Sequence, residues 1–433
     1  MKRLRLLRIT AFALIATAGP ISFSARASGE PPESSLRAAV QRALAQNPEL
    51  AEMEFRIEAA KRRVPQALAL PDPQLVAGAI NVPVPDVSFA RDDMTMKMVS
   101  VEQMIPARGK RRVAAEAATA EVEMVEAMHA GHVNRLIAEV VDAFSETAEL
   151  DARLAIARRS LDRLGRVSES VRARYRVGQG TLPDALLAGV EETKLRDRIR
   201  ALEGDRASAA VRLNTLQGAA AGEAVPPLVL PPLDRTIPER ATVQAAIERS
   251  PDIARAEAEV RRAERDLDAA RLERRPDLKF MASYGERQRR DDMIGATIGV
   301  NLPFFQRRRI AARVAEKEAE LGAAKKKLES IRLSLSREVE QALIDVRREM
   351  DRAALYRETI LTQDRTAAEA AEQAYAVGRI DFETYVRAVL AVDEDEAEAV
   401  MREAALPRAR AKLLAAAGVP LPEIASGEEV RHD

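Results

Sequence analysis

A repeated segment constrains this chain more than any other feature of its sequence. Tyr175-Arg176-Val177-Gly178 returns as Tyr375-Ala376-Val377-Gly378, 200 positions later. A glycine just past the end of a helix can adopt the left-handed conformation that closes the last turn. Each copy follows a long helical pattern and precedes a shorter one. The repeat therefore predicts two helical hairpins, with these segments at their tips.

Further matches extend the duplication over nearly the whole chain. Their offsets differ slightly, and we expect the changes to fall at loops or at helix ends, as in other internal repeats. The matched pairs are Asn47-Pro48 with Ser250-Pro251 at an offset of 203, Pro106 with Pro303 at 197, and Gly218 with Gly418 at 200.

The long segment 111–177 has the periodicity of a coiled coil. Its apolar and small residues alternate spacings of three and four over five heptads, which favours close packing against neighbouring helices. At 1.5 Å per residue, such a helix is about 100 Å long. Thr181 is a predicted N-cap of the return helix, with Pro183 in its first turn. The seam consists of Val140, Ala143, Thr147, Leu150, Leu154, Ala157, Leu161, Leu164, Ser168, Val171 and Tyr175.

Composition supports a mainly helical protein. Charged residues make up 31% of the 433-residue chain and aromatic residues only 3%, which favours long helices over a compact mixed core. The formal net charge is zero, so nothing indicates a nucleic-acid partner. The chain has no cysteine, which excludes disulfides, thiol catalysis and thiolate metal sites.

The first 27 residues read as a secretory signal peptide. Lys2, Arg3, Arg5 and Arg8 form a basic start, an apolar run follows, and Ala25-Arg26-Ala27 places small residues before a cleavage site at Ser28. A short membrane anchor is the alternative, although the apolar run is too short to span a bilayer comfortably.

Four short segments predict two β-hairpins, at 74–82 with 94–105 and at 278–285 with 293–302. In the second hairpin one face is apolar and the other small or polar, which fits a membrane barrel with a wet interior. Lys97 and Gln103 interrupt the apolar face of the first. Four strands cannot close a barrel, and open edges are not tolerated in lipid, so several chains would have to pool their strands.

These features together resemble the TolC-family outer-membrane factors, the exit ducts of Gram-negative tripartite efflux pumps and type I secretion systems. The resemblance covers about 35–418. It depends on the duplication, on the paired Asn47-Pro48 and Ser250-Pro251, on the two Tyr-x-Val-Gly tips, and on Gln103-Met104-Ile105-Pro106 followed by Gly109-Lys110. The chain looks most like the metal and multidrug branch that works with resistance-nodulation-division pumps. Many members of that branch carry a lipid-anchoring cysteine, which this chain lacks.

The resemblance implies a mainly α-helical homotrimer with a 12-stranded β-barrel in the outer membrane and a 12-helix α-barrel in the periplasm. It divides the chain into a signal peptide (1–27), a first repeat (28–218, with a β-hairpin at about 74–105 and a helical hairpin at about 107–218), a linker (219–238), a second repeat (239–418, with corresponding hairpins at about 277–302 and 305–418) and a tail (419–433). It implies a periplasmic adaptor and an inner-membrane pump as partners, and no cofactor, catalytic residue or metal site.

The same resemblance places an adaptor-docking surface and a pore constriction at the hairpin tips. Family channels often carry acidic residues after the second tip, where this chain has Thr384 and Arg387, so a purely acidic gate is in doubt. Asp381 is expected to be an N-cap there. The implied docking residues are Val177, Gly178, Gly180, Val377 and Gly378, and the implied constriction residues are Asp184, Thr384 and Arg387.

Other residues suggest metal chemistry less strongly. His129 and His132, near Met124 and Met128, are three apart on a helix, but a metal site needs more ligands, and exposed polar positions are the simpler interpretation. Met94, Met96 and Met98 alternate on a strand, where filler of one face is favoured over contact with Cu(I). Asp393-Glu394-Asp395-Glu396 is interpreted as a solvated or lumen-facing stretch.

Two functions remain open from the sequence. The first is a passive outer-membrane conduit for substrates delivered by a pump and adaptor. The second is a soluble periplasmic coiled-coil scaffold or adaptor without a pore. The duplicated amphipathic hairpins favour the conduit.

Overall fold

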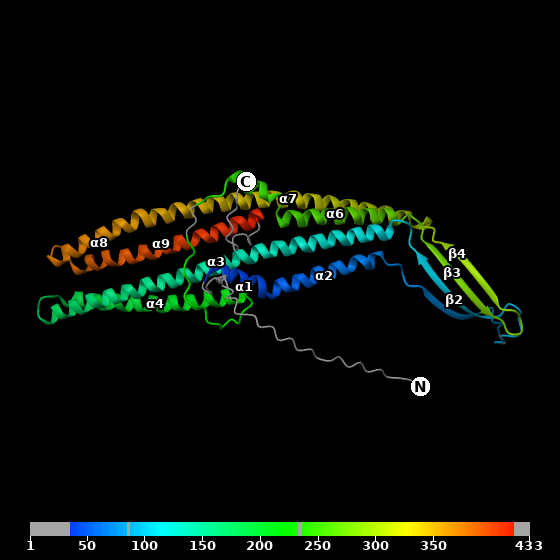
Figure 1. Ribbon diagram of the computed structural model, residues 1–433, viewed down its shortest axis with the longest axis horizontal. Helices are drawn as coiled ribbons and strands as arrows, with labels where there is room; N and C mark the ends of the chain where they lie inside the picture. The colour runs from blue at the N-terminus through cyan, green and yellow to red at the C-terminus, as the bar shows by residue number, and fades with distance from the viewer. Residues whose placement is uncertain (1–34, 85–86, 233–235, 420–433) are drawn as a thin grey trace, which may run out of the picture.

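A computed structural model describes residues 35–84, 87–232 and 236–419. Figure 1 shows an elongated molecule in which the helical hairpin tips lie at one end and the β-strands at the other. The signal peptide predicted at 1–27 lies outside the described residues.

The chain begins with two helices joined at a kink, α1 (Leu36–Gln46) and α2 (Pro48–Leu68). The Asn47 side chain accepts hydrogen bonds from the backbone N–H groups of Glu49 and Leu50, and Pro48 occupies the first turn, where its missing N–H costs nothing. The second repeat has the same kink between α5 (Arg240–Ile247) and α6 (Pro251–Leu272), where Ser250 caps α6.

The long helix α3 (Lys110–Arg176) and its return helix α4 (Leu182–Leu216) form the first helical hairpin. The predicted seam is confirmed: nine of its eleven residues are buried, while Leu161 is half-buried and Tyr175 is exposed. Thr181 caps α4 by accepting a hydrogen bond from the N–H of Asp184, as predicted. Helix α3 also packs against α1, α2, α6 and α9, so it is the common support of both repeats.

The second hairpin differs from the first inside its long helix. Helix α7 (Arg307–Ala354) follows a short 3₁₀ turn, η1 (Phe304–Gln306), and passes through a π-helical segment, η2 (Leu355–Ile360), into α8 (Leu361–Ala376), and α9 (Phe382–Ala417) returns. From Arg307 to Ala376 this helix is three residues longer than α3. The expectation that every offset change falls at a loop or helix end is therefore wrong. A π turn holds one extra residue without breaking a helix, so η2 accounts for part of this difference of three residues.

The two predicted β-hairpins form one antiparallel sheet in the order β1-β2-β3-β4. The strands are β1 (Gln74–Ile80), β2 (Met96–Ile105), β3 (Leu278–Glu286) and β4 (Met293–Val300), each within two residues of its predicted bounds. The register between β2 and β3 pairs Val101 with Ala282, so the sheet joins the two repeats.

The return helices end against the kinks. Gly218 and Gly418 both have a positive φ, of 68° and 70°. A Cβ atom on Gly218 would lie 2.2 Å from the carbonyl oxygen of Gln46, and one on Gly418 would lie 2.4 Å from Cα of Ser250. Both the backbone conformation and the close approach require glycine, which explains why these positions match in the two repeats.

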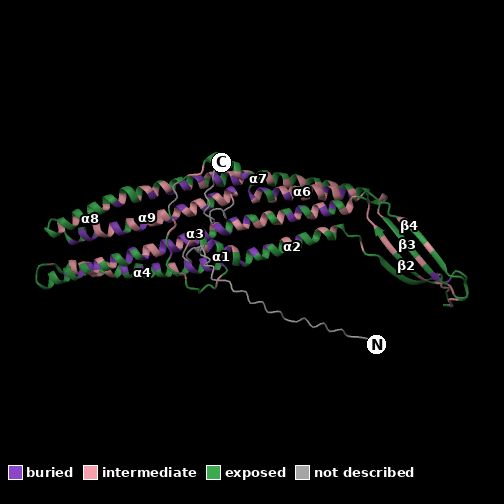
Figure 2. Cartoon of the chain, viewed as in Figure 1, coloured by how far each residue is buried: buried purple, intermediate pink, exposed green. Residues whose placement is uncertain are grey.

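Buried residues are concentrated on the helices, whereas the strands are largely exposed in the single chain (Figure 2). Within the described residues, no helix combines the length and apolarity needed to cross a membrane.

Candidate functional site

The two hairpin tips have the same backbone geometry. Gly178 and Gly378 have φ values of 75° and 73°. In each tip the glycine N–H donates to the tyrosine carbonyl three residues earlier, at 3.0 Å, and the next N–H donates to the carbonyl five residues earlier, at 2.8 Å. These two hydrogen bonds close the helix on a residue in the left-handed conformation. The predicted tips are thus confirmed as turns.

Exposed valines mark both tips. Val177 and Val377 are each 68% exposed, an unusual position for an apolar side chain at the end of a helix. The copies differ at Gly180, where a Cβ atom would lie 3.1 Å from the backbone nitrogen of Tyr175. The second tip has Ile380 there, which packs partly buried against neighbouring apolar residues.

An aromatic cluster ties the second tip together and against the first. The rings of Tyr375 and Tyr385 stack with their centroids 5.0 Å apart, and Phe382 lies 5.7 Å from Tyr375. The guanidinium of Arg174 lies 5.7 Å from the Tyr375 ring, a cation–π contact between the two hairpins. The same cluster includes Leu164, Val171, Ala188 and Leu195 of the first hairpin.

The three candidate constriction residues lie in the first turns of the return helices. Asp184 is half-buried at the start of α4, and Thr384 and Arg387 are exposed on α9. Asp381 caps α9 as predicted, and the hydrogen bonds from Thr384 hold the pKa of Asp381 below its ordinary value. Arg387 forms an ion pair with Glu383 at 2.5 Å. Its charge is therefore largely balanced within its own helix.

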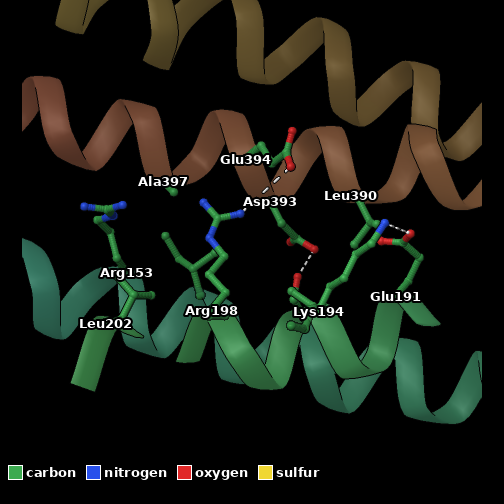
Figure 3. A pocket seen from close by; sticks show the side chains of 13 residues that line it. Arg153, Glu191, Lys194, Arg198, Leu202, Leu390, Asp393, Glu394 and Ala397 are labelled. Atoms are coloured by element: carbon green, nitrogen blue, oxygen red, sulfur yellow. Dashed lines mark hydrogen bonds and ion pairs between the residues drawn. The ribbon is translucent and has the colours of Figure 1, made fainter. Parts of the chain in front are cut away.

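The interpretation of 393–396 as a solvated stretch is wrong for Asp393. This side chain is 8% exposed, accepts a hydrogen bond from Ser160 and pairs with Arg163 at 3.1 Å, both on α3. Its neighbour Glu396 pairs with Arg159 at 3.0 Å. Figure 3 shows Asp393 pointing from α9 toward the first hairpin, beside a small cavity between α3, α4 and α9. The acidic run thus attaches the second hairpin to the first.

A carboxyl pair lies nearby, between Asp395 of α9 and Asp364 of α8. The hydrogen bond with Asp364 of α8, together with burial, raises the pKa of Asp395 from 3.8 to about 6. Below about pH 6 such a pair holds one shared proton, because two adjacent carboxylates repel each other. The sequence placed Asp395 in the acidic run but gave no signal that α8 would bring Asp364 beside it.

The sheet has two chemically different faces. We call the first the apolar face. Its members include Ile294, which is 87% exposed in the single chain. It also carries Lys97, which pairs with Glu286 at 3.8 Å at one end, and Gln103, as the sequence indicated. The apolar face consists of Leu75, Ala77, Ala79, Lys97, Val99, Val101, Gln103, Ile105, Leu278, Phe280, Ala282, Tyr284, Glu286, Ile294, Ala296, Ile298 and Val300.

His129 and His132 do not form a metal site with further ligands among the residues that the structure describes. His132 Nε2 lies 3.2 Å from a carboxylate oxygen of Glu49, beside a cavity that Met128 also lines, while His129 is half-buried elsewhere on α3. Within the part of the chain that the structure describes, no three His, Cys, Asp or Glu side chains converge as metal ligands.

Two duplicated helical hairpins, joined to a sheet with one exposed apolar face, define the architecture of an outer-membrane channel protein. The chain belongs to the outer membrane efflux protein family, whose model matches residues 39–219 and 242–419. This is a family of channel proteins, and the chain is an outer-membrane exit duct of a tripartite efflux system.

Solved structures share this fold. The outer-membrane channel OprN matches with a TM-score of 0.77 at 20% identity, over 88% of this chain and 89% of that one. VceC from Vibrio cholerae matches with a TM-score of 0.75 at 18% identity, over 88% and 96%. The open state of the MtrE channel of Neisseria gonorrhoeae matches with a TM-score of 0.76 at 18% identity, over 90% of each chain. No curated protein sequence matches the chain.

Proposed function

We propose that three copies of this chain assemble into one duct, with a 12-stranded barrel in the outer membrane and a 12-helix barrel in the periplasm. The observation that carries this proposal is the four-stranded sheet, whose outermost strands β1 and β4 have no further strand partner among the described residues. An open edge would leave backbone groups unpaired in lipid, and a symmetric ring removes both edges at once. The apolar face then contacts lipid.

The hairpin tips are the proposed entrance of the duct. They lie at the opposite end of the molecule from the strands (Figure 1), which places them farthest from the membrane. The exposed Val177 and Val377, with Gly178, Gly180 and Gly378 beside them, offer two similar apolar contacts for the helical hairpins of an adaptor. An inner-membrane pump of the resistance-nodulation-division type would supply the energy.

A constriction near Asp184, Thr384 and Arg387 completes the proposal. These residues stand in the first turns after the tips, where 12 helices would converge in a trimer. The local pairing of Arg387 with Glu383 indicates a gate of mixed charge. Ion passage through such a gate depends on these charges without any chemical reaction.

Reconstitution tests the channel directly. The full chain, extracted from outer membranes with detergent, is expected to migrate as a trimer and to give discrete conductance steps in planar lipid bilayers. A strain lacking the protein should become more susceptible to the exported compounds, and the full chain should restore export. Recovery of a water-soluble monomer from the periplasm would instead establish the scaffold alternative.

Substitution at the tips tests the docking role. Gly178→Leu and Gly378→Leu place a bulky side chain at a left-handed position, where non-glycine residues cost about 1 kcal/mol or more. We expect efflux to fall at least about fivefold, since about 1 kcal/mol lost on docking is about fivefold in affinity, while trimers still form. Val177→Ser with Val377→Ser, which keeps the turn and removes apolar surface, separates docking from turn geometry. Normal export by all of these variants would remove the tips as a docking surface.

A further inference from the structure

The face of the sheet opposite the apolar face is unusually rich in methionine. We call it the inner face. Five of the chain's 12 methionines lie on it, and none lies on the apolar face of the four described strands. The inner face consists of Gln74, Val76, Gly78, Ile80, Met96, Met98, Ser100, Glu102, Met104, Lys279, Met281, Ser283, Gly285, Met293, Gly295, Thr297 and Gly299.

Three of these methionines gather around one glycine. Met98 and Met293 are the cross-strand partners of Gly285 on its two sides. The Met96 side chain covers the glycine itself, because a Cβ atom on Gly285 would lie 2.6 Å from Met96 Sδ. Gly285 is buried, as is Ser100 on the same face. Side chains on neighbouring strands are within reach of one another, so the three thioethers can converge above this point.

The space beside Met98 is open on one side. Gly78 pairs with Met98 on the side away from Gly285, and a Cβ atom there would meet nothing within 4 Å. Glycine and methionine thus alternate across the four strands at this level of the sheet, in the order Gly78, Met98, Gly285 and Met293. Gly78 therefore leaves room for a small ligand on one side of Met98.

Packing alone explains the three methionines poorly. A methionine that fills a core is buried among apolar neighbours. Met96 and Met98 are only half-buried, and Met293 is 40% exposed. The rows nearer the helices carry Ser100, Ser283 and other polar side chains on the same face. An exposed thioether on a polar face contributes little to stability but is a good ligand for soft metal ions.

We propose that Met96, Met98 and Met293 form a binding site for a soft monovalent cation, Cu(I) or Ag(I). Thioether sulfur is uncharged, so the site needs no deprotonation and discriminates against hard cations such as Mg²⁺ and Ca²⁺. The site lies toward the end of the sheet farthest from the helices, next to the loops that precede β2 and β4 (Figure 1). This assignment rests on the proposed duct, in which the inner face lines the passage. Weak neutral ligands would let an ion bind and leave, as conduction requires.

Silver binding by the purified trimer tests the site. The full chain in detergent is dialysed against Ag(I) nitrate in chloride-free buffer, and bound silver is measured by mass spectrometry. A variant with Met96→Leu, Met98→Leu and Met293→Leu keeps the apolar volume and removes all three sulfur atoms. We expect its silver affinity to fall at least about tenfold, because the three soft ligands of the proposed site are lost.

Two control variants carry methionine-to-leucine substitutions outside the proposed site. Met104→Leu with Met281→Leu alters the two other inner-face methionines, and Met124→Leu with Met128→Leu alters those near the histidines of α3. Both controls are expected to bind silver like the unsubstituted chain. X-ray absorption of the silver-loaded protein should show sulfur ligands only. Unchanged binding by the triple variant, or oxygen and nitrogen ligands in the loaded protein, would overturn the assignment.

Conductance of the same preparations separates this inference from the proposed duct. A chain that forms normal channels but binds no silver retains the proposed function and loses the metal site. A chain that binds silver through sulfur ligands but forms no channels retains the site and loses the duct. The triple leucine variant should conduct potassium like the unsubstituted chain, which also shows that it folds and assembles.

Discussion

Single glycines set the backbone at the places where helices end. Gly178, Gly378, Gly218 and Gly418 all have positive φ, and each closes a helix. Only the last two are also in contact with another part of the chain, at the kinks before α2 and α6. The tip glycines meet nothing within 4 Å, so a side chain there would change the local turn and the exposed surface but no internal contact.

Gly218→Ala should destabilise the protein strongly. The left-handed conformation costs alanine about 1 kcal/mol, and the added Cβ atom would overlap the carbonyl oxygen of Gln46, which lies 2.2 Å away. We expect a loss of about 2 kcal/mol or more in the free energy of unfolding, measured by chemical denaturation in detergent. Gly322→Ala is the control: it lies inside α7 with nothing within 4 Å, and should stabilise by about 0.5 kcal/mol. Equal stability of the two variants would contradict this account.

The glycines and the caps could be predicted from the sequence because their effects are local. A turn glycine, an N-cap such as Thr181 and a first-turn proline such as Pro48 act within a few residues, and the structure confirms each. The contact between Gly218 and Gln46 joins positions far apart in the chain, so the sequence showed only that Gly218 and Gly418 match. For the same reason Asp393 could not be recognised as buried, since its partners Ser160 and Arg163 are on α3.

At the scale of elements, the two repeats are alike in order and different in detail. Helix periodicity and strand alternation predicted every long element, since both depend on residues close in sequence. The π segment Leu355–Ile360 was missed, because its residues have ordinary helical character and only the count between Pro303 and Tyr375 reveals the insertion. The joining of the two β-hairpins through β2 and β3 was also not predicted, because strand pairing across repeats leaves no local signal.

The contact between α8 and α9 should depend on pH. The pKa of Asp395 is raised to about 6 by its hydrogen bond with Asp364. A carboxyl group whose folded-state pKa is raised stabilises the fold below its ordinary pKa, and this contribution is lost as the pH rises through about 6. Above that pH two carboxylates face each other, with Glu394 and Glu398 of α9 adding further negative charge.

Asp395→Asn removes this repulsion and keeps a hydrogen-bond donor. We expect the melting temperature of the trimer to rise at pH 7.5, to change little at pH 5, and to lose its dependence on pH between these values. Glu383→Gln on the same helix is the matched control, because Glu383 is exposed and lies in the first turn of α9, away from the carboxyl pair. A lower melting temperature for Asp395→Asn at pH 7.5 would mean that Asp364 and Asp395 do not repel each other.

At the scale of the whole molecule, one long helix connects the two halves. Helix α3 contacts α4 of its own hairpin and α9 of the other, while the sheet joins the repeats at the opposite end. The second hairpin is therefore held against the first at two places. One is the aromatic cluster at the tips, and the other, farther from the tips, is the set of ion pairs of Asp393 and Glu396. In the duct proposed above, the entrance opens when these hairpins move apart, and both sets of contacts oppose that movement.

Asp393→Ala should loosen the closed entrance. The substitution removes the acceptor of Ser160 and the partner of Arg163, both at a site that is nearly inaccessible to water. Losing a buried charge-assisted contact costs about 2 kcal/mol, which shifts an equilibrium between closed and open hairpins by more than tenfold. We expect a larger open fraction in planar bilayers without any adaptor present. Glu369→Ala, which alters an exposed residue of α8, should leave the conductance unchanged. Equal open fractions for the two variants would show that the contact between α9 and α3 does not hold the duct closed.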